Sequence, residues 1–293
     1  MPKKNNVVPL VVIGFKDETA FVRGIAKEFG VAPQFAVTKK YKAGESAVSI
    51  PAPVGKKTVV AANAWEDPRW IFNLLLLLGA EVEAGAKEVI LIAPWIAYGR
   101  QDRAAKPGET SAGETIAGAL LSTGVDKIIT LDAHSPRFMK FFKGRLQNIR
   151  ATDAAAAFAS KHKINAVAAA DLGARERALE VSQKLKASMI QITKKRLKSG
   201  SVESGLLKGD AKNKRVLIID DIADSGETLF KAAEILKRKG AVYVSAFVSH
   251  AVCLARLKKE GRKRGLDNIF TVFDHATRSL NAPFNLFVPT RQK

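Results

Sequence analysis

Short apolar runs rich in β-branched residues alternate along the chain with longer segments of helical periodicity. The runs are continuously apolar instead of alternating with polar residues, which is typical of parallel strands buried on both faces. The alternation predicts an α/β protein in which helices cover mainly parallel sheets, and ligands of such sheets bind beyond the carboxyl ends of the strands. Strands are expected at 7–13, 58–61, 88–93, 127–131, 166–170, 215–219 and 242–249, and helices at 71–84, 112–122, 174–185 and 226–239.

Two stretches of the sequence show the same order of features. In each, a Gly-Glu-Thr helix start (113–115 and 226–228) leads through a helix closed by glycine and a strand to a histidine, His134 or His250. A duplicated α/β unit explains this order. We therefore expect two similar domains, residues 1–150 and 151–293, the last residues of which would pack back on the N-terminal domain.

The composition is that of a globular protein. Of 293 residues, 47% are hydrophobic and 26% are charged, which are ordinary values. The single cysteine, Cys253, excludes an internal disulfide and a cysteine-cluster metal site. The longest apolar stretch, 71–78, is too short to span a bilayer, and the N-terminus shows no secretory pattern. We therefore expect a cytoplasmic protein without membrane attachment.

The unusual feature is charge, because 48 Lys and Arg residues against 28 Asp and Glu residues give a net charge of +20. Such an excess attracts phosphate groups, whether on nucleic acid or on small polyanions. The cations are spread along the whole chain, and aromatic residues, at 7%, are poor material for base stacking. We favour small polyanionic substrates and do not expect nucleic acid, although a solvated basic surface has the same composition.

The strongest chemical signal lies at 215–228. An apolar strand there ends in adjacent carboxylates, Asp220 and Asp221, and a turn of small residues then opens a helix. The free amides and the dipole of the helix start would hold a phosphate, while the carboxylates suit ribose hydroxyls or hydrated Mg²⁺. An ordinary helix capped by Asp224 is the plainer interpretation. It accounts for one aspartate but not for three within five positions.

These residues closely resemble the phosphoribosyl-diphosphate (PRPP) binding loop of the type I phosphoribosyltransferase fold. Four further segments match motifs of the ribose-phosphate pyrophosphokinase (PRPP synthetase) family, in the order and spacing of that family, from about Lys40 to His250. The resemblance implies two phosphoribosyltransferase-type α/β domains. It also implies an enzyme that transfers the β,γ-diphosphoryl group of ATP to the anomeric hydroxyl of ribose 5-phosphate, giving PRPP and AMP. The four segments are 98–103, 130–134, 169–177 and 193–196.

The same resemblance assigns roles to residues. Lys194 and Arg196 are the expected catalytic residues. They lie at the start of the stretch 194–214, which we expect to be a long mobile loop able to close over the site. Mg²⁺ is the expected cofactor, with His134 and Asp171 as its ligands, and the family implies at least a homodimer. The expected ATP contacts are Tyr41, Ala43, Gly44, Glu45, Arg100, Gln101, Asp102 and His134, and the expected ribose 5-phosphate contacts are Asp220, Asp221, Asp224, Ser225, Gly226, Glu227 and Thr228.

The sequence departs from the family pattern at several positions. Ala43 replaces an aspartate of the ATP segment, and Glu227 stands where the family usually has glycine. We expect the backbone N–H of Glu227 to bind the phosphate and its side chain to point away. An Asn-Asp signature is reduced to 66–69.

Arg175 and Arg177 fit the exposed face of a helix that begins near Gly173.

Two other functions stay open at this point. One is a phosphoribosyltransferase that consumes PRPP, an activity for which the Arg-Gln-Asp segment at 100–102 and the Lys-x-Arg segment at 194–196 are not needed. The other is a non-catalytic paralogue that regulates a true synthetase. The retained Lys194, Arg196, His134 and Asp171 argue against the paralogue.

Overall fold

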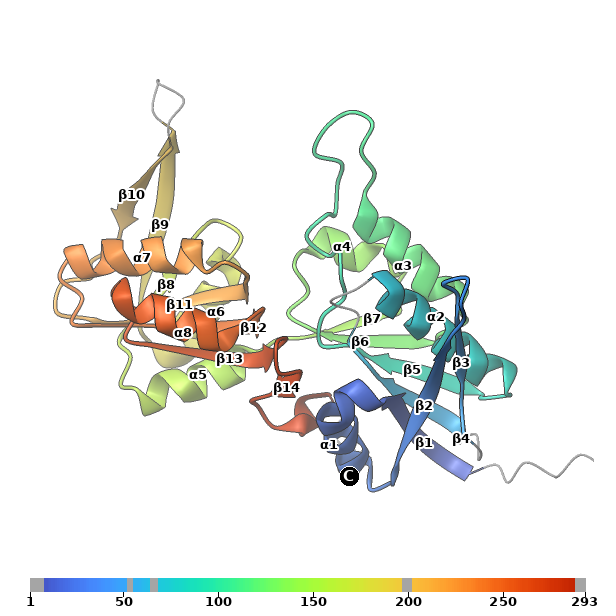
Figure 1. Cartoon of the computed structure of the whole chain (residues 1–293). Coiled ribbons are helices and arrows are strands. Elements are labelled where there is room, and N and C mark those ends of the chain that lie inside the picture. Colours follow the sequence, from blue (N-terminus) through green and yellow to red (C-terminus); the bar gives the residue numbers. More distant parts are fainter. Residues whose placement is uncertain (1–7, 52–54, 64–67, 197–201, 288–293) are drawn as a thin grey trace, which may run out of the picture. The chain divides into compact units, whose positions relative to one another are not determined.

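The computed structural model describes residues 8–51, 55–63, 68–196 and 202–287 (Figure 1). The chain divides into two compact units, which are considered separately. Unit 1 comprises Met1–Ile149 together with Pro283–Lys293, and unit 2 comprises Arg150–Ala282. Among the helices that the structure describes, none is long and apolar enough to cross a membrane.

Unit 1 is a sheet of seven strands in the order β3-β2-β1-β4-β5-β6-β7. All neighbouring strands are parallel except β2 and β3, which form an antiparallel hairpin at one edge. Its elements are β1 (Val8–Phe15), the 3₁₀ helix η1 (Lys16–Glu18), α1 (Thr19–Phe29), β2 (Pro33–Lys40), β3 (Ser46–Ser49), β4 (Gly55–Ala61), α2 (Pro68–Glu83), β5 (Glu88–Ile92), α3 (Ala112–Ser122), β6 (Lys127–Leu131), α4 (Pro136–Lys140), β7 (Leu146–Ile149) and η2 (Phe284–Phe287).

The last described turn of the chain belongs to unit 1. The 3₁₀ helix η2 packs on α1, and the ring of Phe287 meets that of Phe21 edge-on with centroids 6.1 Å apart. Phe287 is 1% exposed. A buried aromatic side chain contributes strongly to packing, so this contact fastens the C-terminal segment to the N-terminal half of the sequence.

Unit 2 repeats the architecture of unit 1. Its seven strands follow the order β10-β9-β8-β11-β12-β13-β14, again with an antiparallel hairpin, β9–β10, at one edge. At the opposite edge β14 is antiparallel to β13, whereas the last strand of unit 1 is parallel. Its elements are α5 (Thr152–Lys161), β8 (Ala166–Ala169), α6 (Arg175–Leu185), β9 (Ser188–Arg196), β10 (Val202–Lys208), β11 (Arg215–Ala223), α7 (Glu227–Arg238), β12 (Tyr243–Ala251), α8 (Leu254–Lys263), β13 (Asn268–Asp274) and β14 (Ser279–Leu280).

Helices cover both faces of the sheet in unit 2, as continuously apolar strands require. The strand residues Val216 and Ile218 belong to one core cluster with Leu229 and Phe230 of α7. The helix α6 packs instead against β8, β9 and β11 through Ala178 and Val181, which lie outside that cluster. From Val216 to Ile219, the residues of β11 therefore point alternately to the α7 side and to the α6 side.

The expectation of a long mobile loop at 194–214 was wrong. Lys194 and Arg196 lie in β9, and β10 pairs with it antiparallel, with Lys194 opposite Ser204 and Arg196 opposite Val202. Residues 197–201 fall outside the described part of the chain. A lysine-rich hairpin at the edge of a sheet needs no apolar periodicity, because backbone hydrogen bonds form it and charge on it discourages pairing with other chains. The lysine-rich composition of this stretch therefore did not indicate a hairpin.

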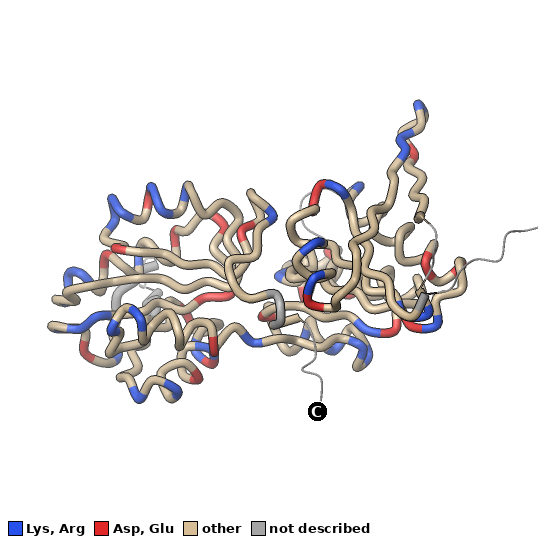
Figure 2. The backbone as a smooth tube through the Cα atoms, turned by 90° about the horizontal axis from the view of Figure 1, so that it is seen from below, with Lys and Arg blue, Asp and Glu red and all other residues tan. Residues whose placement is uncertain are grey.

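The basic residues are spread over both units. Figure 2 shows Lys and Arg along helices and turns of each, interspersed with Asp and Glu. In unit 2 several of them form ion pairs, such as Lys237 with Asp267 at 2.7 Å. A dispersed distribution of this kind differs from the continuous basic stripe that is typical of nucleic-acid binding.

Candidate functional site

The turn between β11 and α7 is built around Gly226. This residue is the N-cap of α7 and has a φ of +83°, a left-handed conformation that favours glycine. A Cβ placed on it would come within 2.5 Å of the Phe230 ring and 2.6 Å of Leu257. The positive φ and the close approach of Phe230 and Leu257 both favour glycine at this position. With no side chain there, the backbone of the turn lies close to the helix start. The first amides of α7 lack partners within the helix and, with the helix dipole, suit an anion.

The carboxylate of Glu227 is held by Arg264. The two side chains form an ion pair at 2.7 Å, and Arg264 also donates to Glu234 at 2.5 Å. These bonds raise the pKa of Arg264 above its ordinary value, the bond to Glu234 being the largest cause. The ion pair with Arg264 gives the Glu227 side chain a reason to point away from a phosphate. This orientation toward a bound phosphate stays a prediction.

Asp220 and Asp221 lie inside β11 and not in the loop after it. They are 9% and 3% exposed, and the backbone N–H of Asp221 donates to Asp220 Oδ1 at 3.0 Å. Burial raises the pKa of the Asp220 carboxyl well above its ordinary value. The charges of Asp221 and Asp171 add to this rise, while that of Arg177 opposes it. Three carboxylates thus gather where the strands β8 and β11 end.

Arg177 compensates the charge of this group through its ion pair with Asp221. It was expected on the exposed face of its helix, but it is 8% exposed and its Nη2 lies 3.2 Å from Asp221 Oδ1. A signal was present in the sequence. Arg177 lies four residues before the buried Val181, on the stripe of α6 that faces the sheet.

Asp171 lies two residues after the end of β8 and is half-buried. Its Oδ1 accepts the backbone N–H of Ala174 at 2.9 Å, and its carbonyl accepts from Gln191 at 3.2 Å. A carboxylate fixed in this way, close enough to Asp220 to raise its pKa, is the kind of oxygen donor that Mg²⁺ binds. The residues therefore fit a divalent cation. Among the described residues, no group of three or more His, Cys, Asp or Glu is arranged as a metal cage.

In unit 1, Asp102 connects the loop after β5 with the loop after β6. It is 4% exposed, and its two carboxylate oxygens accept from Ser135 at 2.7 Å and from Arg103 at 3.0 Å. Its carbonyl accepts from Arg137 at 2.8 Å. Burial acts to raise the pKa of this carboxyl, but the bonds from Ser135 and Arg103 and the charges of Arg103 and His134 outweigh it and lower the pKa.

The residues beside Asp102 differ from it in exposure. Arg100 and Gln101 are exposed, which leaves their side chains accessible to a polyanion. His134 is half-buried between β6 and α4, directly before Ser135, whose Oγ caps α4 by accepting from the N–H of Phe138 at 3.0 Å. Asp102 is thus bonded as a support for this edge of the sheet, and Arg100 and Gln101 face outward from it.

The turn between β2 and β3 borders a groove of about 560 Å³. Tyr41 and Glu45 close the turn, with the N–H of Tyr41 donating to the Glu45 carbonyl at 2.8 Å, and Gly44 has a φ of +94°. Tyr41 is 45% exposed and Ala43 is not part of the lining. Volumes of this order accommodate small ligands. The groove is lined by Tyr41, Gly44, Glu45 and Ser46 of the hairpin and by Arg69, Phe72, Leu75 and Leu76 of α2.

Some expected site residues have only a backbone position. Lys194 and Arg196 lie in β9, but their side chains are outside the described part of the structure, as are residues 66 and 67. Asp224, Ser225 and Thr228 flank Gly226 at the start of α7, and the carbonyl of Asp224 accepts from Arg256 at 2.6 Å.

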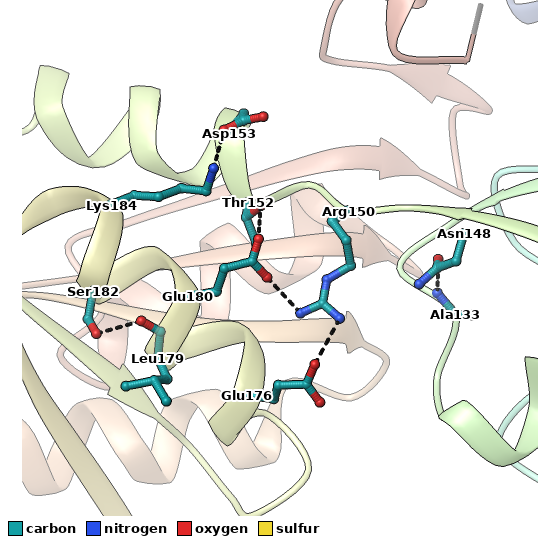
Figure 3. A network of polar contacts seen from close by, with 10 residues as sticks. All are labelled: Ala133, Asn148, Arg150, Thr152, Asp153, Glu176, Leu179, Glu180, Ser182 and Lys184. Carbon is teal, nitrogen blue, oxygen red and sulfur yellow. Dashed lines mark hydrogen bonds and ion pairs between the residues drawn. The ribbon is translucent and has the colours of Figure 1, made fainter. Parts of the chain in front are cut away.

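A polar network joins the start of unit 2 to α6 (Figure 3). Arg150 reaches Glu180 at 3.0 Å and Glu176 at 3.5 Å, and Thr152 donates to Glu180 at 2.8 Å. Lys184 and Asp153 form a further pair at 2.7 Å between α6 and α5. Exposed pairs of this kind contribute little individually, but together they fix the outer side of the helix that carries Arg177.

Two family models match the chain in succession. The model described as the N-terminal domain of ribose phosphate pyrophosphokinase matches residues 10–124, and that of the phosphoribosyl transferase domain matches residues 145–279. The two matches cover the greater part of units 1 and 2 in turn.

Curated relatives give the same picture. A ribose-phosphate pyrophosphokinase of Campylobacter jejuni is 31% identical over 79% of this chain and 76% of its own length. That of Pyrococcus furiosus is 34% identical over 73% and 77%. That of Methanopyrus kandleri is 29% identical over 94% of both chains.

A solved structure confirms the predicted α/β fold. The crystal structure of phosphoribosylpyrophosphate synthetase from Mycobacterium smegmatis superposes with a TM-score of 0.79, over 90% of this chain and 88% of the other, at 23% identity. Two mostly parallel sheets covered by helices are therefore an arrangement that this chain shares with a solved structure.

Proposed function

The chain belongs to the ribose-phosphate pyrophosphokinase family, and from this premise we propose that it transfers the β,γ-diphosphoryl group of ATP to the anomeric hydroxyl of ribose 5-phosphate. The products are PRPP and AMP. The observation that carries the proposal is the match of residues 10–124 to the N-terminal pyrophosphokinase domain. A phosphoribosyltransferase that consumes PRPP does not need such a domain, and for this reason it is the weaker candidate.

Unit 2 is proposed to bind ribose 5-phosphate at the start of α7. The amides from Ser225 to Thr228 would hold the 5-phosphate, and the hydroxyls of these two residues would add donors. Asp220, Asp221 and Asp224 are the expected carboxylates for the ribose hydroxyls. The positive φ of Gly226 and its lack of a side chain support this, because they allow the backbone to approach a phosphate closely.

Unit 1 is proposed to bind ATP. The exposed Arg100 and Gln101 would contact its phosphates, while the buried Asp102 supports them through Ser135 and Arg137. Charge-assisted bonds from arginine to phosphate are short and strong. Tyr41, Gly44 and Glu45 would bind the adenosine part in the groove against α2, with Ala43 contributing only backbone.

The chemistry of the transfer depends on positioning and charge stabilisation. Mg²⁺, if held by the residues named next, would supply positive charge that offsets the negative charge of the phosphates. Asp171, with the neighbouring Asp220, fits this ion, and His134 is the expected ligand on the ATP side. Lys194 and Arg196 would stabilise the charge that develops on the transferred group. The anomeric oxygen forms a bond to the β-phosphorus of ATP while the bond from that phosphorus to the α,β-bridging oxygen breaks. AMP leaves with the bridging oxygen, and the proton of the hydroxyl passes to water.

An AMP-release assay tests the proposal. The purified protein, given ATP, ribose 5-phosphate and Mg²⁺, should form AMP, and omission of ribose 5-phosphate should abolish it. Lys194→Ala should lower kcat by about a hundredfold or more, as expected for loss of transition-state stabilisation, with smaller changes in KM. The absence of AMP above background, unaltered by Lys194→Ala, would refute the function. Other nucleoside triphosphates in place of ATP would define the donor.

The assembly and location of the protein follow the family. We expect at least a homodimer in the cytoplasm. Light scattering coupled to size-exclusion chromatography should give a mass of at least twice 31.7 kDa.

A further inference from the structure

The ion pair between Arg177 and Asp221 lies inside unit 2. The two side chains are 9% and 5% exposed, and their charged atoms are 3.2 Å apart. Removing two charges from water is costly, and a fold retains such a pair only where each charge compensates the other. A buried pair directly beside a proposed substrate carboxylate, Asp220, therefore requires an explanation in terms of that site.

The two adjacent aspartates differ in their partners. Asp221 forms the ion pair with Arg177 of α6. The carboxylate of Asp220 accepts the backbone N–H of Asp221 at 3.0 Å, and the pairing of β11 with β12 runs through Asp220 and then Ile222. The cation of α6 is therefore bonded to Asp221, directly beside Asp220.

The helix that carries Arg177 is fixed independently of the pair. Ala178, Val181 and Ser182 are buried, and Glu180 accepts from Arg150 and Thr152 (Figure 3). Arg177 also acts to lower the pKa of Asp220, on which Asp221 and Asp171 act in the opposite sense. A cation held on a packed helix can therefore compensate a cluster of three carboxylates.

We propose that Arg177 is a positioning residue of the sugar site, which neutralises Asp221 inside the fold and leaves Asp220 as the carboxylate of the pair that contacts the sugar. The inference rests on the proposed function and deepens it. Asp221 then supports the end of β11 in place of contacting ribose. Without the cation, two adjacent carboxylates would repel at the strand end, and the turn leading to Gly226 would shift.

Variants of the pair separate positioning from general stability. Arg177→Met leaves Asp221 buried without its cation and should raise the KM for ribose 5-phosphate about tenfold, with less than about a twofold change in the KM for ATP. Arg177→Lys should recover part of the loss, because one ammonium replaces the guanidinium fork. The double variant Arg177→Met with Asp221→Asn removes both charges and should recover most of it. Arg175→Met, on the exposed side of the same helix, is the matched control and should behave as the unaltered protein.

Asp220→Asn provides the contrast, since it should raise the KM for ribose 5-phosphate about a hundredfold, whatever stands at position 177. The proposal is overturned if the double variant is as impaired as Asp220→Asn, because Asp221 would then contact the sugar itself. It is also overturned if Arg177→Met leaves both KM values unchanged. Should Arg177→Met fail to fold, the double variant still decides, since it lacks the unpaired charge.

Binding of ribose 5-phosphate without ATP distinguishes this inference from the proposed function. The measured quantity is the rise in thermal midpoint that ribose 5-phosphate produces in each variant. An unaltered protein that binds the sugar but forms no AMP would refute the proposed function and leave the role of Arg177 measurable by binding. An unaltered protein that does not bind the sugar would refute both.

Discussion

The two units have the same strand order but opposite charges at the corresponding edge of the sheet. In unit 1 a buried acid, Asp102, supports outward-facing Arg100 and Gln101. In unit 2 a buried cation, Arg177, supports the end of a strand that carries carboxylates. In both, the buried group has the charge opposite to that of the groups it supports. In the proposed function, one architecture would thus present a cationic edge to the nucleotide and an amide and carboxylate edge to the sugar phosphate.

The largest effect is expected from Gly226, because unit 2 depends there on backbone geometry. Gly226→Ala would combine a positive φ with a Cβ 2.5 Å from Phe230, and should destabilise the turn by about 3 kcal/mol and abolish stabilisation by ribose 5-phosphate. Thermal melting with and without the sugar measures this. The control is Gly240→Ala, which has a φ of +85° and its nearest contact at 3.5 Å. It should cost about 1 kcal/mol and retain sugar binding. Equal behaviour of the two variants would contradict the prediction.

A smaller effect is expected in unit 1, where a side chain and not the backbone supports the site. Asp102→Asn weakens the bonds from Ser135 and Arg103 and should raise the KM for ATP about tenfold, with the KM for ribose 5-phosphate unchanged. Steady-state kinetics with each substrate varied in turn would show it.

The matched control for Asp102 is Asp126, which directly precedes β6 and lies beside the amino end of β5. Its carboxylate accepts the N–H of Val89 at 2.8 Å, so it also fastens this strand, but away from the proposed ATP edge. Asp126→Asn should lower thermal stability without affecting the KM for ATP. If both variants raise that KM alike, Asp102 acts through the stability of the sheet and the comparison between the units fails.

The smallest expected effect is a difference in acid sensitivity. His275 of unit 2 is 1% exposed, and burial, followed by the charge of His250, lowers its pKa well below 6.5. The unfolded chain therefore binds a proton that the folded chain does not. The contribution is fully present above the unfolded pKa of about 6.5 and is lost as the pH falls towards the folded value, at up to about 1.4 kcal/mol per pH unit.

Urea unfolding from pH 7 down to pH 5 tests this against His275→Gln, which does not titrate. The stability of the unaltered protein should fall more steeply than that of the variant. The difference between the two profiles is the measurement, because the raised pKa of Asp220 acts in the opposite direction in both. The lowered pKa of Asp102 in unit 1 supports stability above about its ordinary value of 3.8, so the contribution of that residue is retained over this range. Parallel profiles would show that His275 contributes nothing.

Particular elements show how far the sequence predicts the fold. The helix α3 (Ala112–Ser122) and the strand β6 (Lys127–Leu131) have the predicted bounds, because their periodicity and flanking glycines are local signals. The strand β11 runs four residues past the predicted 219 to Ala223, since pairing with β12 continues through Ile222 and Ala223. Pairing of that kind involves residues distant in sequence, and hydrophobicity along one strand does not reveal it.

The candidate site shows the same division. The order of its motifs, the Gly-Glu-Thr helix start and the adjacent aspartates are properties of the sequence, and they sufficed to indicate the family. Whether Arg177 is exposed, which partner holds Glu227 and whether Asp102 faces outward depended on side chains from other elements. Local chemistry determines which groups are present and where an element begins. Burial and ion pairing arise only when elements pack, because each is a relation between residues that the chain itself keeps far apart.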